Sequence, residues 1–120
     1  MTKVVILEDN IMIALVLRAI IQKMGLAYSQ FVKPSQAIHK KAIEKADLII
    51  TDFEMPPENA LDLLEYMKKK NITKPIIMYS AYSDAKERVE KAGYKDLICE
   101  YLHKPAEISK IIEVVEKYKK

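Results

Sequence analysis

Apolar residues occur along the chain in two kinds of block, which differ in their period. Short blocks of β-forming residues, most of them continuous apolar runs, have the pattern of strands that are buried on both faces of a parallel sheet. They predict strands at Lys3–Glu8, Ala27–Val32, Asp47–Thr51, Pro75–Ser80 and Ile98–His103. The blocks between them have the 3.6-residue period of amphipathic helices. They predict helices at Ile11–Met24, Ser35–Lys45, Leu61–Lys70, Asp84–Ala92 and Ala106–Tyr118.

The alternation of strand and helix predicts an α/β architecture. A series of this kind folds as a doubly wound parallel sheet with helices on both faces. The usual order of five such strands is 2-1-3-4-5, which places the first and third strands side by side. We therefore expect residues 1–120 to form a single domain around a five-stranded sheet.

Helix ends also have recognisable residues. Gly25 and Gly93 are expected to stop the first and fourth helices, and Ser35 and Asp84 are plausible N-caps. The final helix is expected to turn one apolar stripe toward the sheet, formed by Ile108, Ile111, Ile112 and Val115.

Carboxylates follow two of the predicted central strands. Glu8 and Asp9 end the first strand, and Asp52 follows the third. One such pair could simply cap the following helix, but parallel strands bring their carboxyl ends to one edge, where α/β sheets bind ligands. Clustered carboxylates repel one another unless a cation is present, and their oxygens suit Mg²⁺ or Mn²⁺. The sequence therefore predicts a divalent-cation site.

Two further polar residues end the later strands. Ser80 ends an apolar strand, where its hydroxyl could contact a phosphoryl oxygen. Lys104 precedes Pro105, and a cis peptide bond there would aim the ammonium group inward. A lysine beside an acidic metal site suggests that the same pocket also takes an anion.

Together these motifs resemble the receiver domain of bacterial response regulators over the whole chain. The resemblance is carried by Glu8-Asp9, Asp52 with Met55-Pro56, Ser80-Ala81, Tyr101 and Lys104-Pro105. It implies the flavodoxin-like (βα)5 receiver fold. It also implies a cytoplasmic signalling domain that accepts a phosphoryl group, rather than an enzyme that turns over a substrate.

The resemblance assigns a role to each site residue. Asp52 would accept the phosphoryl group from a histidine kinase or a histidine phosphotransfer protein. The Mg²⁺ ligands would be Asp9 and Asp52 directly, Glu8 through water, and the backbone carbonyl of Glu54. Ser80 and Lys104 would bind the phosphoryl oxygens. Tyr101 would be the aromatic switch, which alters the surface of the fourth helix, fifth strand and final helix for a downstream protein or an output domain of the same chain.

Two segments depart from the family pattern. Ala60 stands where the family usually has a glycine, so this loop is expected to take another path or to tolerate strain. The segment Gly93–Glu100 is longer than is typical, so we expect a short fourth helix followed by a long loop.

The first helix has more apolar residues than one face can bury. The helical period turns five of them inward: Ile13, Val16, Leu17, Ile20 and Met24. It leaves Ile11, Ala14 and Leu15 outside, which suggests a docking patch for the helical partner that carries the phosphohistidine. A homodimer seam or scattered apolar residues are the alternatives.

The composition argues against several other classes. Cys99 is the only cysteine, so there is no internal disulfide, and no apolar stretch is long enough to cross a membrane. The net charge is +3 and no basic stripe occurs, so we expect no direct nucleic-acid binding. His39 and His103 have no partners for a metal site, and Cys99 is expected to be a packed thiol.

Three rival functions conflict with residues of this chain. A small phosphohydrolase that forms an aspartyl phosphate would have a second aspartate where this chain has Glu54. A flavin-binding module would need a Ser/Thr/Gly-rich loop where this chain has residues 10–13, Asn-Ile-Met-Ile. A receiver-like interaction domain that is never phosphorylated would lack one of the acids or the lysine.

Overall fold

The most apolar segments of the chain form the centre of a parallel sheet. In the computed structural model, which describes residues 2–120, β1 (Lys3–Leu7), β3 (Leu48–Thr51) and β6 (Ile76–Ser80) are flanked by β2 (Ala27–Phe31) and β7 (Glu100–His103). The strand order is β2-β1-β3-β6-β7, and all four pairings are parallel. This is the predicted 2-1-3-4-5 order of a doubly wound, flavodoxin-like sheet.

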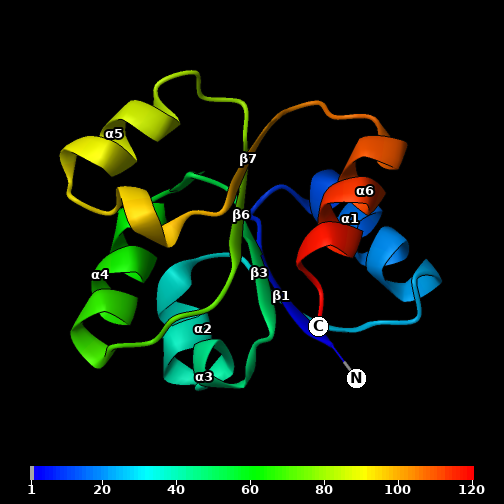
Figure 1. Cartoon of the computed structure of the whole chain (residues 1–120), viewed down its shortest axis with the longest axis horizontal. Helices are drawn as coiled ribbons and strands as arrows, with labels where there is room; N and C mark the ends of the chain where they lie inside the picture. Colours follow the sequence, from blue (N-terminus) through cyan, green and yellow to red (C-terminus); the bar gives the residue numbers. More distant parts are fainter. Residues whose placement is uncertain (1) are drawn as a thin grey trace.

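Helices cover both faces of the sheet because successive strand residues point to opposite sides. One face is covered by α1 (Ile11–Lys23) and α6 (Ile108–Tyr118). The other is covered by α2 (Pro34–His39), α3 (Ala42–Lys45), α4 (Ala60–Lys70) and α5 (Ala85–Lys91). Figure 1 shows α1 and α6 to the right of the sheet and the other helices to its left.

The two hydrophobic clusters follow from this alternation. Within β1, Val4 and Ile6 belong to the cluster under α1 and α6, whereas Val5 and Leu7 belong to the cluster under the other helices. The core therefore has two layers, one on each face of the sheet.

The second predicted helix is interrupted. Lys41 has a φ of 58°, a left-handed conformation that ends α2 and separates it from α3. The N-cap of α2 is Lys33 rather than Ser35, with Pro34 in the first turn, where its missing N–H is not needed. Asp84 does stand at the N-cap of α5, but its side chain makes no capping hydrogen bond.

Gly25 and Gly93 follow α1 and α5 with φ angles of 76° and 86°. Both glycines therefore stop their helices as predicted, because this left-handed region has little steric penalty without a Cβ atom.

The buried stripe of α6 differs from the prediction at its start. Ile111, Val114 and Val115 are buried, but Ile108 is 56% exposed. The helix begins at Ile108 rather than at Ala106, so Ile108 lies in its first turn.

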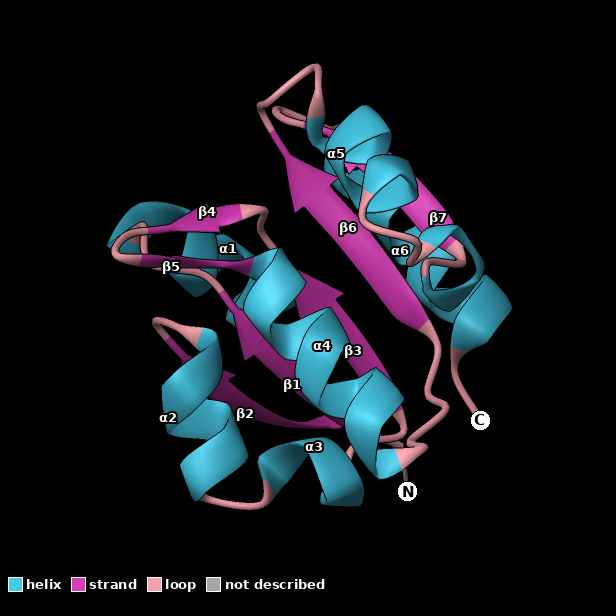
Figure 2. Ribbon diagram, turned by 90° about the vertical axis from the view of Figure 1, so that its left-hand side faces the viewer, coloured by secondary structure: helices cyan, strands magenta, loops and turns pink. Residues whose placement is uncertain are grey.

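Both segments that depart from the family pattern adopt regular local structure. Ala60 is the buried first residue of α4 and does not have a positive φ, so the expected strain is absent there. Before it, β4 (Glu54–Met55) and β5 (Glu58–Asn59) form a hairpin, which Figure 2 shows at the upper left beside the strand ends. The segment after the short α5 contains a 3₁₀ turn, η1 (Lys95–Leu97).

None of the helices in the described part of the chain is long and apolar enough to cross a membrane.

Candidate functional site

The carboxyl ends of β1 and β3 bring three acids together. The two strands are hydrogen-bonded neighbours, with Leu7 paired to Thr51, so Glu8, Asp9 and Asp52 leave the sheet at the same edge. One carboxylate oxygen of each residue lies within 4.8 Å of those of the other two. The predicted acidic cluster is therefore present.

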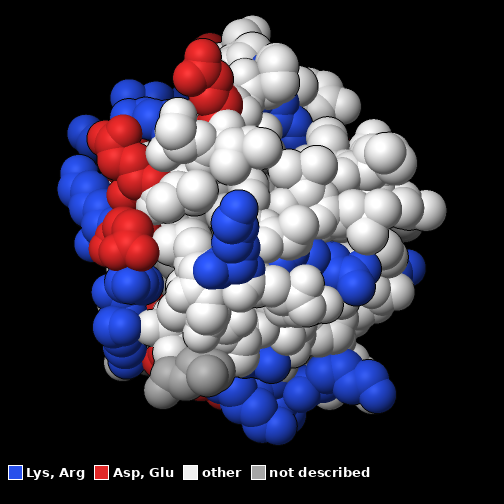
Figure 3. Space-filling model, turned by 90° about the vertical axis from the view of Figure 1, so that its right-hand side faces the viewer, with Lys and Arg blue, Asp and Glu red and all other residues white. Residues whose placement is uncertain are grey.

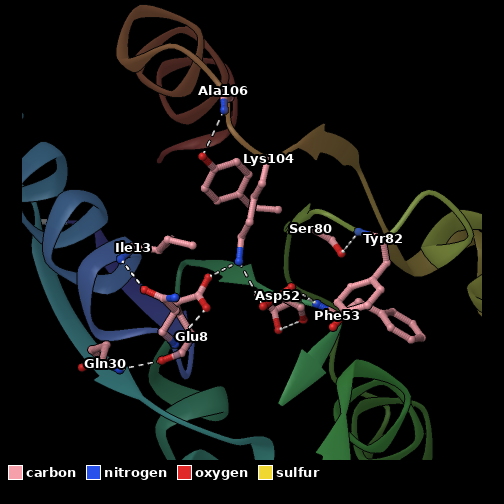
Figure 4. Close-up of polar contacts among 12 residues, drawn as sticks. Glu8, Ile13, Gln30, Asp52, Phe53, Ser80, Tyr82, Lys104 and Ala106 are labelled. Carbon is pink, nitrogen blue, oxygen red and sulfur yellow. Dashed lines mark hydrogen bonds and ion pairs between the residues drawn. The ribbon is translucent and has the colours of Figure 1, made fainter. Parts of the chain in front are cut away.

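Lys104 reaches into this cluster from the end of β7. Its Nζ lies 2.6 Å from Glu8 Oε1 and 3.0 Å from Asp52 Oδ2, and Figure 4 shows the ammonium group between the two carboxylates. The backbone N–H of Lys104 donates to the Ser80 carbonyl at 2.9 Å, and the Lys104–Pro105 peptide bond is cis, as predicted. The lysine side chain is only 10% exposed.

Burial and ion pairing act in opposite directions on the pKa values of Glu8 and Lys104. Burial raises the pKa of Glu8, and the hydrogen bonds from Lys104 and the Asn10 N–H oppose this rise. Burial alone would lower the pKa of Lys104, but the carboxylates of Glu8 and Asp52 outweigh it and raise the pKa above its usual value. Lys104 therefore stays protonated at neutral pH.

Both oxygens of Asp52 are held in place. Oδ1 accepts the Phe53 N–H at 2.7 Å, while Oδ2 accepts Lys104. The Asp52 N–H donates to the Leu7 carbonyl at 2.9 Å, which fixes the backbone. Asp52 is 6% exposed, so one buried carboxylate with a fixed orientation lies at the centre of the site.

The donor set fits a hard divalent cation. All three clustered side chains offer carboxylate oxygens, which Mg²⁺ and Mn²⁺ prefer, and none offers sulfur or imidazole. Among residues 2–120 no second group of three potential ligands occurs, and neither His39 nor His103 belongs to this one.

Ser80 and Tyr101 lie on the neighbouring strands β6 and β7. Ser80 is 4% exposed, and its Oγ accepts the Tyr82 N–H at 3.0 Å instead of contacting Asp52. The Tyr101 hydroxyl is buried and has no hydrogen-bond partner among residues 2–120, and burial raises the pKa of Tyr101. A cavity of about 170 Å³ lies between the two residues and is also lined by Ala85 and Lys86.

The predicted docking patch is partly wrong. Ile11 and Leu15 are 74% and 47% exposed, but Ala14 is only 3% exposed and packs toward the sheet. Val16, which was expected inside, is 44% exposed. The buried side of α1 consists of Ala14, Leu17, Ile20 and Ile21. Leu17 and Ile20 belong to both the predicted and the observed face, so the helix is rotated by only part of a turn, which buries Ala14 and Ile21 and exposes Val16.

The exposed part of α1 is larger than predicted. Met12 is 70% exposed and adds to Ile11, Leu15 and Val16, and Ile108 at the start of α6 is exposed as well. Figure 3 shows the face formed by α1 and α6 as a broad area of uncharged residues with few basic side chains on it.

The prediction that Cys99 is a packed thiol is wrong. The residue is exposed rather than packed, although its thiol donates to the Ile76 carbonyl at 3.2 Å. It precedes β7, the edge strand, so only one neighbouring strand covers it.

Several supporting residues were not predicted. Gln30 Nε2 donates to the Glu8 carbonyl at 3.0 Å, and Asn10 caps α1 by accepting the Ile13 N–H at 3.1 Å. Arg88 of α5 pairs with Glu54 of the hairpin at 3.1 Å. Asn10 could have been recognised as a polar residue just before an apolar helix, but a tertiary ion pair such as Arg88–Glu54 leaves no local pattern in the sequence.

Comparisons with known proteins agree with this geometry. The family model described as "Response regulator receiver domain" matches residues 4–116. Among curated proteins, the chemotaxis protein CheY of Thermotoga maritima is 29% identical over 121 residues, which cover 98% of either chain. The DNA-binding transcriptional regulator NtrC of Escherichia coli is 27% identical over 112 residues. That match covers 93% of this chain but 24% of NtrC, so the chain spans about a quarter of that relative.

Solved structures show the same fold. The receiver domain of the Francisella response regulator 1452 superposes with a TM-score of 0.83 at 26% identity, over 98% of this chain and 96% of the other. The response regulator TrrA of Thermotoga maritima, in a complex with Mg²⁺ and BeF, has a TM-score of 0.81 at 24% identity, over 98% and 99% of the two chains.

Proposed function

The chain belongs to the response regulator receiver domain family of two-component signalling, and from this premise we propose that it accepts a phosphoryl group on Asp52 from a phosphohistidine. The observation that carries the proposal is the position of the Lys104 ammonium group, 3.0 Å from Asp52 Oδ2 and 2.6 Å from Glu8 Oε1. The ammonium group therefore lies directly beside the carboxylate oxygens that would attack phosphorus. It also stands where a transferred phosphoryl group needs its charge neutralised.

The reaction needs positioning more than covalent chemistry from the protein. An Asp52 oxygen attacks phosphorus, the new O–P bond forms as the P–N bond breaks, and the imidazole of the donor leaves with the electron pair. Lys104 then exchanges a carboxylate partner for a phosphoryl oxygen. The Ser80 hydroxyl accepts the Tyr82 N–H before transfer. It then rotates to donate a hydrogen bond to another phosphoryl oxygen.

Glu8, Asp9 and Asp52 provide the carboxylates for a divalent cation, with the Glu54 backbone carbonyl as a further ligand. When bound, Mg²⁺ or Mn²⁺ neutralises charge on the phosphoryl oxygens and on the acids. Glu8 has the least exposed carboxylate of the three and makes the shorter of the two contacts with Lys104, so we assign it a contact through water.

The product is an acyl phosphate, so the domain acts as a switch of limited lifetime rather than as a turnover enzyme. Movement of Ser80 toward the phosphoryl group opens space beside the cavity that it shares with Tyr101. The Tyr101 ring then settles inward, and the surface of α5, β7 and α6 changes for the downstream partner. A ligand shifts such an equilibrium only through contacts that differ between the two states.

The test of the acceptor uses acetyl phosphate and Mg²⁺. We expect the intact mass of the wild-type chain to rise by one phosphoryl group, and that of Asp52→Ala to stay unchanged. Asp62→Ala is the matched control, because Asp62 is an exposed acid in the first turn of α4 and should leave labelling intact. Equal labelling of wild type and Asp52→Ala would contradict the assignment.

The exposed apolar residues of α1 are proposed as the docking surface for the histidine kinase or phosphotransfer protein. Three exposed residues lie in the first two turns of α1, directly after the acidic loop: Ile11, Met12 and Leu15. We expect Leu15→Asp to slow transfer from a phosphohistidine donor while acetyl phosphate labelling persists. Loss of both activities would indicate misfolding. Retention of both would show that Leu15 is not part of the docking surface.

A further inference from the structure

Arg88 of α5 touches two consecutive residues that follow Asp52. Its guanidinium group pairs with Glu54 Oε2 at 3.1 Å, and its central carbon lies 4.6 Å from the centre of the Phe53 ring. Phe53 is fully buried. One side chain therefore binds the segment by charge and by stacking, a combination for which the planar guanidinium is suited.

The segment that Arg88 holds is part of the acceptor site. The Phe53 N–H donates to Asp52 Oδ1 at 2.7 Å, so displacement of Phe53 moves the acceptor carboxylate. Figure 4 shows this hydrogen bond as a dashed line between the Phe53 nitrogen and the Asp52 carboxylate. Under the proposed function, the carbonyl of the next residue, Glu54, binds the divalent cation. Neither contact of Arg88 is with the cation or with Asp52 itself, so Arg88 acts through its neighbours.

Helix α5, which carries Arg88, is held in place by few buried side chains. α5 has seven residues, and of these only Ala85 and Val89 are buried. Among the described residues, Arg88–Glu54 is the one ion pair that joins α5 to another element; the second, Lys91–Glu87, lies within the helix. A small movement of the Phe53–Glu54 segment is therefore passed to α5 with little resistance from packing.

We propose that Arg88 is a positioning residue that holds the Phe53–Glu54 segment in its metal-binding arrangement and thereby couples occupancy of the acceptor site to the position of α5. This proposal rests on the proposed function, but the route differs from the one through Ser80 and Tyr101. It runs through the β4–β5 hairpin instead of through strands β6 and β7. Because coupling between two sites is reciprocal, a partner that binds α5 also changes the affinity for the divalent cation.

The pair is partly exposed, at 39% for the Arg88 side chain and 28% for Glu54, so we expect it to add little to overall stability. Its effect should appear at the cation site instead. Partners that orient metal ligands typically change metal affinity by about tenfold or more when they are removed. A loss of affinity without a comparable loss of stability is therefore the signature of a positioning role.

The experiment is an NMR titration of the backbone amides of Phe53, Glu54 and Val89 with Mg²⁺, which needs no phosphodonor. We expect Arg88→Gln to weaken Mg²⁺ binding by about tenfold and Arg88→Lys to weaken it less. Glu54→Gln should weaken binding by no more than Arg88→Gln does, because it removes the ion pair but leaves the contact with Phe53. The double variant should bind no more weakly than Arg88→Gln alone, because that substitution already removes the ion pair. The matched control is Lys91→Gln, which removes a charge from the same helix but breaks only the pair with Glu87.

Equal Mg²⁺ affinity in Arg88→Gln and Lys91→Gln would overturn the proposal. If the wild type shows no response to Mg²⁺, amide hydrogen exchange without the cation decides. Exchange of the Phe53 and Glu54 amides must then be faster in Arg88→Gln than in Lys91→Gln, and equal rates would again overturn it. Failure of acetyl phosphate to label the wild type would count against the proposed function and not against this contact.

Discussion

Helices α1 and α5 lie on opposite faces of the sheet beside the same site, but they are anchored very differently. α1 has thirteen residues, four buried side chains and a capping hydrogen bond that Asn10 accepts from the Ile13 N–H. α5 has seven residues, two buried side chains and no side-chain cap. The difference indicates a division of labour, because few buried contacts mean low local stability. α1 supports the acidic loop, whereas α5 is free to respond to it.

Core truncation should show this difference most strongly. Leu17 of α1 is 2% exposed, and we expect Leu17→Ala to lower the free energy of unfolding by about 3 kcal/mol. Val89 of α5 is fully buried but smaller, and we expect Val89→Ala to lower it by about 1.5 kcal/mol, the value of two buried methyl groups. Urea denaturation measures both. A larger loss for Val89→Ala would reverse the comparison.

The caps offer a second test with smaller effects. Asn10 Oδ1 accepts the Ile13 N–H at 3.1 Å, so we expect Asn10→Ala to destabilise the protein by about 1 kcal/mol. Asp84 occupies the same position in α5 without a capping hydrogen bond, so Asp84→Ala should change stability by no more than about 0.3 kcal/mol. Similar losses for both variants in thermal and urea unfolding would show that α5 is capped in solution.

The smallest effect concerns the hydroxyl of Tyr101, which is buried beside α5 and has no hydrogen-bond partner in the described part of the chain. Removing an unsatisfied buried group is favourable, so we expect Tyr101→Phe to raise stability at pH 7 by about 0.5 kcal/mol.

The effect of Tyr101→Phe on stability also depends on pH, and its direction follows from the pKa of Tyr101. Burial raises the pKa of Tyr101 above its usual value of 10.0. The neutral phenol is therefore favoured in the folded state, and its contribution is complete below pH 10 and is lost as the pH rises through the folded-state pKa. Above pH 10 the wild type should lose stability faster than Tyr101→Phe in urea titrations. Parallel pH profiles would mean that the ring is not buried in solution.

The strand ends were predictable from sequence because two rules act together. Apolar runs that stop at Glu8 and Asp52 mark buried strands, and parallel strands deliver their carboxyl ends to one edge. The position of Lys104 needed the resemblance as well, since no local pattern distinguishes an inward lysine from an exposed one.

The orientation of α1 could not be predicted in the same way. From Ile11 to Leu17 every residue is apolar, so the period that normally separates the buried face from the exposed face is not visible. Ala14 is buried and Val16 exposed because the sheet decides which side packs. The break at Lys41 and the Arg88–Glu54 pair likewise depend on contacts between elements that are distant in sequence.

Lys104 gives the acidic cluster a counter-ion that is covalently part of the chain. Two buried carboxylates share its ammonium group, so the repulsion between them is offset inside the folded protein. We therefore expect a chelator such as EDTA to abolish phosphorylation while leaving the unfolding midpoint nearly unchanged. The shape of this protein would then persist through swings in the magnesium supply of its surroundings, and only the rate at which it receives a signal would follow them.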